Sequence, residues 1–409
     1  MTLKNQLKKP IRKIVLAYSG GLDTSVILTW LKEHYAADVV ACYINVGQRE
    51  NIPQIRKKAF RTGASAFFAP DARLEYVTDY IWPALQARAV YESRYLLGTS
   101  LARPLIAQKV IEVARRTGAD AVCHGSTGKG NDQVRFELAF GALAPDLCVI
   151  APWREWDFEG RQDLIDYARG HNIPVPVTKA KPYSSDENLW HISHEGGILE
   201  DLSKPVPENV YSWTASPSRA PSRMEPVEIG FESGKPVSVN GRRTGPIGII
   251  ETLNRAGGKH GIGRVDLVEN RLVGMKSRGI YESPAATILY AAHEELESLA
   301  LDRETLHAKN LVAARYGELV YFGLWFSPLR KSLAAFVKET QRHVTGRVKL
   351  GLYKGGLSVL SRSCAKSLYS KGLASFEKAG LYDQKDATGF IRLFGLPLRI
   401  SAQVQRNKN

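Results

Sequence analysis

The sequence of 409 residues predicts an α/β protein with a doubly wound parallel sheet, a second domain of mixed α+β structure and an appended C-terminal tail. Two observations lead to this prediction. In the first part of the chain, short apolar runs rich in β-branched residues alternate with segments whose apolar residues recur at helical spacing. After Val175-Pro176-Val177 this alternation stops, and a proline-rich stretch from Ser203 to Pro226 precedes short strand-like runs with glycine turns.

Four apolar runs are expected to form the parallel sheet, at residues 14–18, 39–46, 119–124 and 147–151. Between them, residues 24–35 and 101–116 carry apolar side chains at helical spacing. Three glycines each follow a basic helix end and are expected to terminate a helix, namely Gly63, Gly118 and Gly170. Ligands of such sheets bind beyond the carboxyl ends of the strands, so the loops after the first and third runs are expected to face one crevice.

The second domain is expected to contain short strands and one strong helix. That helix follows Ser283-Pro284, which supplies a serine at the cap position and a proline at the first helical position. No regular structure is expected in the proline-rich stretch. The predicted domains are a flexible basic tail (1–13), the parallel-sheet domain (14–177), the mixed domain (178–383) and the C-terminal tail (384–409).

Composition limits the class of protein. No apolar run approaches about 18 residues and the basic N-terminus lacks an apolar signal core, so we expect neither a membrane span nor secretion. The four cysteines form no Cys-x-x-Cys pair, which favours a reducing cytoplasm over a disulfide framework. His191 and His194 have the spacing of metal ligands, but no second cluster accompanies them, so no dedicated metal site is expected.

The net charge of +15 fits two kinds of partner. A basic surface attracts nucleic acid, and it equally concentrates small anionic substrates. The positive residues are dispersed and no RNA-binding module is recognisable, so we expect small anions and no nucleic acid.

The densest polar turn is Ser19-Gly20-Gly21-Leu22-Asp23-Thr24-Ser25, between an apolar run and a helical pattern. Adjacent glycines let a backbone approach an anion, and free N–H groups at a helix start favour negative charge. Asp23 adds a carboxylate that suits a magnesium ion beside phosphates. The lysine of a Walker loop and the glycine spacing of a dinucleotide fingerprint are both absent. An ordinary strand-to-helix turn rich in capping residues is the structural alternative.

As a unit, this string resembles the signature of the ATP pyrophosphatase superfamily, whose members cleave ATP between the α and β phosphates. The longer string Ala17-Tyr18-Ser19-Gly20-Gly21-Leu22-Asp23-Thr24-Ser25 is similar to the version in the argininosuccinate synthase family. The resemblance implies a nucleotide-binding first domain, a synthetase second domain and a helical C-terminal tail.

A second polar cluster runs from His124 to Arg135, in the order His124-Gly125-Ser126-Thr127-Gly128-Lys129-Gly130-Asn131-Asp132-Gln133-Val134-Arg135. Its glycines expose backbone N–H groups, Asp132 can receive an amino group, and Arg135 can clamp a carboxylate in bidentate fashion. The alternative is a plain helix cap at Asp132 followed by a solvated helix. Functional polar groups concentrate on such loops, so the whole cluster favours binding.

This second string is similar to the second motif of the argininosuccinate synthase family, with Ser126 in place of alanine. Further similar blocks are Tyr95-Leu96-Leu97-Gly98-Thr99-Ser100, Ala151-Pro152-Trp153-Arg154-Glu155-Trp156, Lys181-Pro182-Tyr183-Ser184, Glu269-Asn270-Arg271 and Gly274-Met275-Lys276-Ser277-Arg278-Gly279. The resemblance therefore extends from about residue 14 to about residue 391.

The resemblance implies a reaction in which ATP adenylates citrulline and aspartate then displaces AMP, giving argininosuccinate and pyrophosphate. It implies ATP binding by residues 17–25, Gly125 and Ile44, where the family has an alanine at the last position. Aspartate contacts would be Thr127, Asn131 and Asp132. Citrulline contacts would be Tyr95, Ser100, Asn131, Arg135, Ser184, Ser193, Glu269 and Tyr281. Asp23, Asn131 and Asp132 are expected to take part in the chemistry.

The family also implies cofactors and assembly. ATP is a substrate that brings Mg²⁺ with it, and no organic cofactor is expected. Members are homotetramers whose C-terminal helix reaches another subunit. Here Pro397 replaces a helix-compatible residue, so the helix either starts near Pro397 or is kinked. Two other functions stay open, an RNA-modifying pyrophosphatase and a non-catalytic nucleotide sensor on the same fold.

Overall fold

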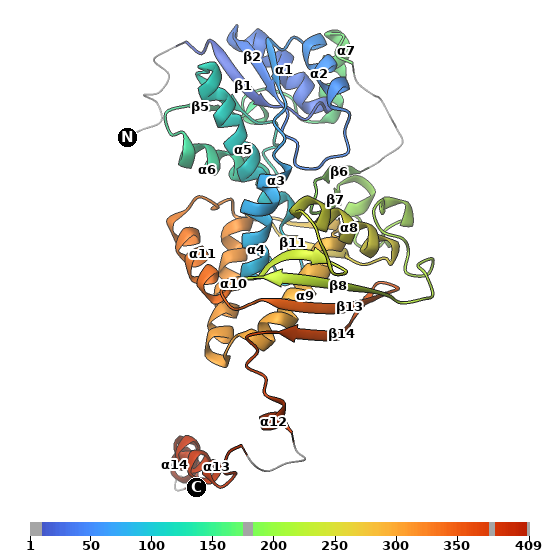
Figure 1. Ribbon diagram of the computed structural model, residues 1–409. Helices are drawn as coiled ribbons and strands as arrows, with labels where there is room; N and C mark the ends of the chain where they lie inside the picture. The colour runs from blue at the N-terminus through green and yellow to red at the C-terminus, as the bar shows by residue number, and fades with distance from the viewer. Residues whose placement is uncertain (1–9, 175–182, 376–380, 407–409) are drawn as a thin grey trace. The chain divides into compact units, whose positions relative to one another are not determined.

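The computed structural model describes residues 10–174, 183–375 and 381–406 (Figure 1). The chain divides into two compact units, residues 1–366 and 367–409. The expected domain boundary at 177/178 lies outside the described residues, and the four-part division of the chain stays a prediction. None of the described helices is long and apolar enough to cross a membrane.

A five-stranded parallel sheet forms the first part of the large unit, in the order β3-β2-β1-β4-β5. Its strands are β1 (Lys13–Ala17), β2 (Asp38–Cys42), β3 (Ala66–Phe68), β4 (Ala121–Cys123) and β5 (Cys148–Ile150). Four of these match the expected runs, and only β3 was not predicted. The strand order reverses between β1 and β4, the position at which ligands bind in open sheets of this kind.

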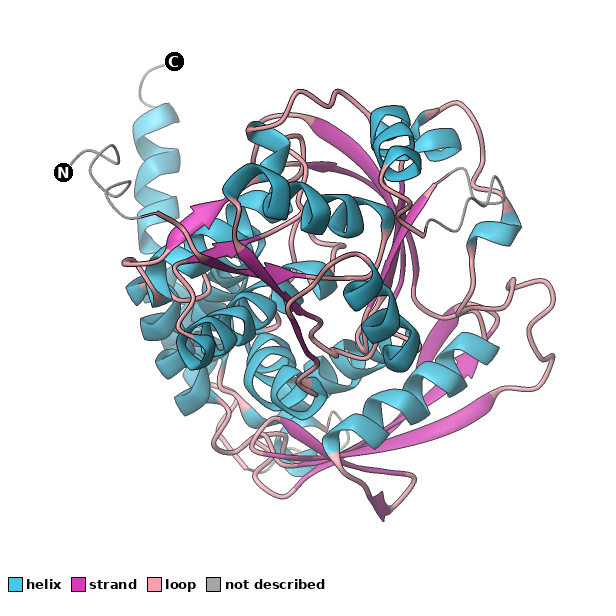
Figure 2. Ribbon diagram, turned by 90° about the horizontal axis from the view of Figure 1, so that it is seen from above, coloured by secondary structure: helices cyan, strands magenta, loops and turns pink. Residues whose placement is uncertain are grey.

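Helices cover both faces of this sheet, as Figure 2 shows from above. Successive residues of a strand point to opposite faces. Accordingly, Ile14 and Leu16 pack in one apolar cluster with α1 (Leu22–Tyr35), and Val15 packs in another with α5 (Gly98–Thr117). The first cluster also takes in α2 (Ile52–Arg61) and α7 (Arg161–Gly170), and the second takes in α6 (Asn131–Leu143). The doubly wound sheet is confirmed.

Two of the three helix-ending glycines were placed correctly. Gly118 is the left-handed cap of α5, with φ of 63°, and Gly63 follows α2 with φ of 104°. The expectation for Gly170 is wrong, because Gly170 is the last residue of α7 and His171 follows it as the cap. The left-handed conformation falls instead on Asn172, with φ of 53°, a residue type that tolerates it.

The rest of the large unit holds two antiparallel sheets. One has the order β10-β9-β8-β13-β14, with β8 (Glu225–Glu232), β9 (Lys235–Val239), β10 (Arg242–Arg243), β13 (Gly346–Tyr353) and β14 (Gly356–Cys364). The other has the order β11-β12-β7-β6, with β6 (Ser184–Glu187), β7 (Ile192–Glu195), β11 (Arg264–Asn270) and β12 (Lys276–Glu282). The mixed second domain is therefore confirmed in its architecture.

Helices connect and cover these sheets. They are α8 (Pro246–Lys259), α9 (Pro284–Ala300), α10 (Arg303–Tyr321) and α11 (Pro328–Thr340), with the short turns η3 (Pro152–Arg154), η4 (Gly197–Glu200) and η5 (Glu208–Val210). A further helical stretch precedes α5 and consists of α3 (Arg73–Glu75), η2 (Tyr76–Ile81) and α4 (Trp82–Ala87). The strong helix after Ser283-Pro284 is confirmed as α9. Its serine occupies the cap position, but the side chain makes no capping hydrogen bond.

The small unit contains α12 (Lys371–Ala374), α13 (Asp386–Phe394) and α14 (Leu396–Arg406). Pro397 is the second residue of α14, so the helix starts near the proline and is not kinked by it. Large apolar side chains of this unit are exposed, among them Phe390, Leu393, Phe394 and Leu398.

Glu282 ties the irregular segment before β8 to the sheet of β12. Its carboxylate is fully buried and accepts hydrogen bonds from the backbone N–H groups of Ser212, Trp213 and Thr214, at 2.7, 2.9 and 2.7 Å. His194 Nε2 lies 3.2 Å from the same carboxylate. Burial acts to raise the pKa of Glu282, but these hydrogen bonds hold it below its ordinary value.

Replacing Glu282 with alanine is expected to lower the free energy of unfolding by about 3 kcal/mol, because three backbone N–H groups lose their buried acceptor. Since the folded pKa is depressed, this stabilisation is complete at neutral pH and is lost as pH falls from 4.5 through the folded value. Urea unfolding at pH 7 and pH 4 measures both effects. Glu251→Ala, at an exposed position of α8, is the control. Equal stability of the Glu282 and Glu251 variants at pH 7 would contradict this account.

Candidate functional site

Two polar loops leave the same edge of the parallel sheet. One follows β1 and the other follows β4, and these strands are paired neighbours, with Leu16 opposite Cys123. A Cβ atom on Gly125 would lie 3.1 Å from Thr24 Cγ2 and 3.2 Å from Ile27 Cδ1. The loops therefore approach each other closely, as the strand assignments predicted, and a Cβ at position 125 would be tighter than ordinary van der Waals contact.

The first loop turns sharply into α1. Gly20 has φ of +78°, which favours glycine, and a Cβ there would lie 3.2 Å from Ile55 Cγ2. The first hydrogen bond of the helix runs from Ser25 N to Gly21 O at 3.2 Å, and no side chain caps the helix. The earlier N–H groups of the first turn thus have no intrahelical acceptor, an arrangement that favours an anion at the start of the helix.

Charged side chains surround this turn. Asp23 is half-buried, and burial raises its pKa while the positive charge of Arg161 acts in the opposite direction. Lys58 Nζ donates to Gly20 O at 2.6 Å, and burial lowers the pKa of Lys58. Lys58 thus lies at Gly20 and the charge of Arg161 acts on Asp23, a combination of two cations and one carboxylate that suits a phosphate chain with its metal ion.

Hydrogen bonds between hydroxyl groups stabilise the first loop. Ser19 Oγ and Thr24 Oγ1 are 3.1 Å apart, and Ser25 Oγ lies 3.1 Å from the Tyr18 hydroxyl. Ala17 is the last residue of β1, and Leu22 is the first residue of α1. Ile44 lies just beyond β2 with its side chain buried, and its carbonyl accepts a hydrogen bond from Gln48 Nε2 at 3.2 Å.

The second loop ends at α6, which begins at Asn131 with Gly130 as its cap residue. Gly130 N donates to Thr127 O at 3.2 Å, and the Thr127 side chain is exposed. Asn131 is held on both sides, since its Nδ2 donates to the Tyr321 hydroxyl at 2.9 Å and its Oδ1 accepts from Leu272 N at 2.8 Å. This loop is therefore joined to both α10 and the turn between β11 and β12.

A row of alternating charges begins on α6. Arg135 Nη1 donates to Asp132 Oδ1 at 2.9 Å, and Arg103 Nε donates to Asp132 Oδ2 at 2.8 Å. Arg103 Nη2 in turn donates to Asp186 Oδ2 at 2.6 Å. Burial acts to raise the pKa of Asp132, but the two guanidinium groups hold it below its ordinary value. Asp132 is therefore an ionised carboxylate in a fixed orientation.

Aromatic side chains line the adjoining space. The rings of Tyr95 and Tyr281 are 4.7 Å apart, and Arg135 lies over the ring of Tyr321 at 4.8 Å. Glu269 Oε2 and Ser100 Oγ are buried and make no hydrogen bond among the described residues. Burial raises the pKa of Glu269, while Arg135 acts to lower it. Buried polar atoms in proteins nearly always have a hydrogen-bond partner, so these two atoms suit a polar ligand.

Two predicted residues lie on the sheet of β6 and β7. Ser193 pairs with Tyr281 across the strands, and its hydroxyl donates to Asp186 O at 3.4 Å, so it belongs to the same site. Ser184 is opposite Glu195 on the edge strand β6, where its side chain is exposed. No contact described here joins Ser184 to Tyr95 or Arg135.

Several residues that the structure brings to the site were not among the predicted site residues, namely Lys58, Thr99, Arg103, Arg161, Asp186, Glu195, Arg271 and Tyr321. Arg271 pairs with Glu195 at 2.8 Å. Arg103 follows Ser100 by three positions on α5, so helical spacing was a signal that could have found it.

His191 and His194, the two histidines of metal-like spacing, also lie at this site. Burial and the nearby charge of Arg103 lower the pKa of His191 to about 3. No cluster of three or more metal-ligating side chains occurs among the described residues.

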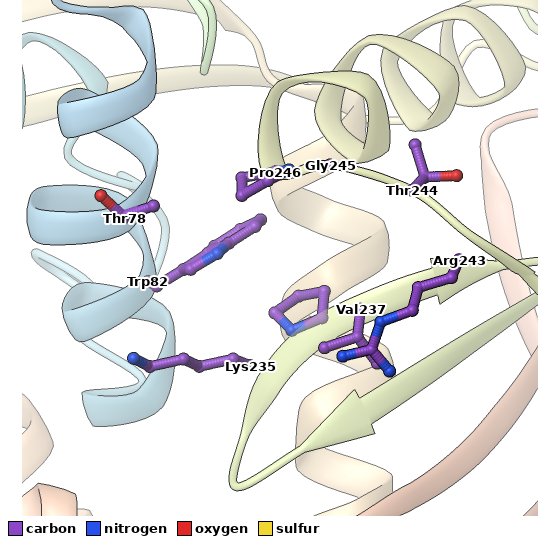
Figure 3. Close-up of a pocket in the computed structure, with 9 residues that line it drawn as sticks. Thr78, Trp82, Lys235, Val237, Arg243, Thr244, Gly245 and Pro246 are labelled. Atoms are coloured by element: carbon purple, nitrogen blue, oxygen red, sulfur yellow. The ribbon is translucent and has the colours of Figure 1, made fainter.

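A separate pocket of about 460 Å³ lies between η2–α4, the β9–β10 hairpin and the start of α8 (Figure 3). Trp82, Pro236 and Pro246 form part of its wall, and Lys235 and Arg243 lie at it. It shares no residue with either polar loop, so the site is defined by the loops and not by this pocket.

Comparison with known proteins agrees with this geometry. Residues 13–174 match the family described as Arginosuccinate synthase N-terminal HUP domain, and residues 183–401 match Arginosuccinate synthase C-terminal domain. An argininosuccinate synthase of Carboxydothermus hydrogenoformans is 58% identical over 394 residues, covering 96% of this chain and 98% of its own. One from Endomicrobium trichonymphae is 56% identical over 398 residues, covering 97% and 96%.

A solved U34-tRNA thiolase from Methanococcus maripaludis is 15% identical, over 43% of this chain and 64% of its own, with a TM-score of 0.27. That score is too low to bear on fold or function.

Proposed function

Because the chain belongs to the argininosuccinate synthase family, we propose that it makes argininosuccinate at the two loops described above. It is an ATP-dependent ligase of arginine biosynthesis, which joins L-citrulline and L-aspartate while ATP is cleaved to AMP and pyrophosphate. The observation that carries the placement is the close approach of the two loops, since a Cβ added to Gly125 would lie only 3.1 Å from Thr24 Cγ2. A nucleotide at the first loop is thereby beside the amino-acid groups of the second.

The first loop is proposed to hold the phosphates of ATP. The free N–H groups of α1 face the phosphate oxygens, and Lys58 and Arg161 add positive charge. Asp23 fits a Mg²⁺ ion that arrives with ATP, because this metal is usually bound by one or two carboxylates together with phosphates. When bound, the ion neutralises charge on the phosphate chain.

The second loop and the sheet of β12 are proposed to hold the two amino acids. Citrulline is a zwitterion, so Arg135 suits its carboxylate, and Glu269, whose Oε2 makes no hydrogen bond among the described residues, suits its ammonium group. Tyr95, Ser100, Ser184, Ser193 and Tyr281 complete the hydrogen bonds to citrulline. Aspartate is proposed to lie against Thr127, Asn131 and Asp132.

The chemistry explains why three substrates must meet. Nitrogen donates electrons into the ureido carbon of citrulline and makes it a poor electrophile. Attack of the ureido oxygen on the α-phosphorus releases pyrophosphate and leaves that oxygen as part of an AMP leaving group. The aspartate amine then adds to the carbon, and AMP departs with the oxygen. The protein contributes mainly position and charge stabilisation.

The enzyme is proposed to act in the cytoplasm as a homotetramer. Its four cysteines are free, which fits a reducing compartment. The exposed apolar side chains of α13 and α14 would be covered by another subunit, as a surface of this kind commonly marks an interface. Light scattering should give four times the mass of 45.3 kDa. A monomer would contradict the assembly but not the reaction.

A product assay tests the function. The full chain is incubated with Mg²⁺-ATP, citrulline and aspartate, and argininosuccinate, AMP and pyrophosphate are expected in equal amounts. Omission of either amino acid should abolish argininosuccinate. Bound ATP without product would favour a nucleotide sensor. Tight tRNA binding that weakens steeply with salt would favour an RNA-modifying enzyme.

A further inference from the structure

His124 is fully buried at the end of β4, and the reaction described above gives it no role. Its Nδ1 accepts the backbone N–H of Ser126 at 3.3 Å, and its ring stacks on Phe136 with centroids 5.6 Å apart. Because Nδ1 is an acceptor, Nε2 carries the proton of the neutral ring and donates to Glu137 Oε1 at 3.3 Å. The imidazole therefore links the second loop to α6 in one tautomer.

Gln133 holds the same loop from its other end. It is the third residue of α6, and its Nε2 donates to Gly128 O at 2.6 Å and to Gly130 O at 3.3 Å. Its Oε1 accepts from Arg154 Nη1 at 2.9 Å. The same Nη1 donates to Glu137 Oε1 at 2.6 Å. Both attachments of the loop thus end on one guanidinium group.

We propose that His124, Gln133, Glu137 and Arg154 form a loop clamp that positions ATP and aspartate together. The clamp fixes residues 125–130, which carry the proposed ATP contact Gly125 and the proposed aspartate contact Thr127. His124 and the other three are positioning residues, since they act through the loop. This inference rests on the proposed function for its choice of substrates.

The negative charge of Glu137 fixes the direction of the hydrogen bonds in the clamp. Burial acts to raise its pKa, but hydrogen bonds from His124 and Arg154 lower it to about 2, so it is ionised under assay conditions. A carboxylate can only accept, which keeps the ring proton on Nε2 and leaves Nδ1 to receive Ser126 N–H. Arg154 is 46% exposed, and exposed ion pairs contribute little to stability. The effect of the clamp should therefore appear in substrate binding more than in melting temperature.

Two substitutions of His124 separate its two hydrogen bonds. In His124→Asn the amide oxygen stands near the place of Nδ1 and can still accept Ser126 N–H. In His124→Gln the amide nitrogen stands near Nε2 and can still donate to Glu137, but the loop loses its acceptor. We expect His124→Gln to raise KM for both ATP and aspartate about tenfold, and His124→Asn to stay within about threefold of wild type. KM for citrulline should change less than twofold in both.

Arg154→Ala still tests the proposed clamp if the substitutions of the buried His124 unfold the protein. We expect it to raise KM for ATP and aspartate together by about threefold, with an unchanged melting temperature. His260→Asn is the matched control, since His260 is also fully buried and lies 3.2 Å from a glutamate, Glu225, outside the site. It should change stability without changing either KM.

Equilibrium binding of Mg²⁺-ATP distinguishes failure of the clamp from failure of the proposed function. Weaker ATP binding by folded His124→Gln and by Arg154→Ala supports the clamp even if the wild type makes no argininosuccinate. Wild-type ATP affinity in Arg154→Ala, or equal changes in all three KM values, would overturn the clamp while leaving the ligase function intact.

Discussion

Replacing Asp23 with alanine is expected to slow pyrophosphate release about 100-fold or more while the protein stays folded. Asp23 is the carboxylate at the start of α1, beside N–H groups that have no intrahelical acceptor. Loss of one group that stabilises developing charge commonly costs 10²–10³ in rate. Asp23→Asn keeps the shape and removes the charge, so it should lose nearly as much activity. Pyrophosphate release in the presence of citrulline measures the effect.

The control for Asp23 lies in the same domain. Asp38 is the exposed first residue of β2, at the amino end of a parallel strand and hence at the sheet edge opposite the loops. Asp38→Ala should retain wild-type turnover. Since burial raises the pKa of Asp23 above its ordinary 3.8, acid should also inactivate the wild type at a higher pH than an exposed aspartate would allow. Near-normal turnover of Asp23→Asn would show that the carboxylate of Asp23 does not act at the phosphate site.

The second large effect is expected at Arg135. Its Nε donates to Tyr321 O at 2.9 Å and its Nη1 to Asp132, whereas its Nη2 makes no hydrogen bond among the described residues. The fork is thus held in place with one nitrogen available to a carboxylate. Hydrogen bonds between charged groups contribute about 1.5–3 kcal/mol each, so Arg135→Ala should raise KM for citrulline about 100-fold. KM for ATP should change little.

Arg135→Lys tests the geometry of the fork, because a lysine has the charge but not the planar donors. It should still raise KM for citrulline about tenfold. Arg115→Ala is the control, since Arg115 also pairs with an aspartate, Asp146, but on the exposed side of α5. Steady-state kinetics with citrulline varied gives the comparison. An unchanged KM for citrulline in Arg135→Ala would show that another residue binds its carboxylate.

The sequence predicted the parallel sheet well because its signals are local. Apolar runs, helical spacing and glycine turns each lie within a few residues, and the two polar loops follow β1 and β4 directly. The strand β3 was missed because its three residues, Ala66–Phe68, are half-buried and too short for a pattern. The prediction that Gly170 follows a helix was wrong by one residue, because α7 includes Gly170 and ends there.

The remainder of the site depends on contacts that no local pattern encodes. The sheet of β7 and β12 pairs His194 with Ile280, residues far apart in the chain. Helical spacing marks Arg103 on the face of Ser100, but it does not encode the pairing of Arg103 with Asp132 and Asp186, and Tyr321 comes from α10. Family resemblance supplied the residues that are named in its motifs. It did not supply the residues that hold them, which only the packing of separate elements brings together.

The central claim is that the citrulline ureido oxygen attacks the α-phosphorus of ATP at this site. Citrulline labelled with ¹⁸O in the ureido group tests it most directly. Mass spectrometry of the products should find one ¹⁸O in each AMP and none in pyrophosphate or argininosuccinate. Unlabelled AMP formed together with argininosuccinate, or formation of ADP and phosphate, would contradict the account.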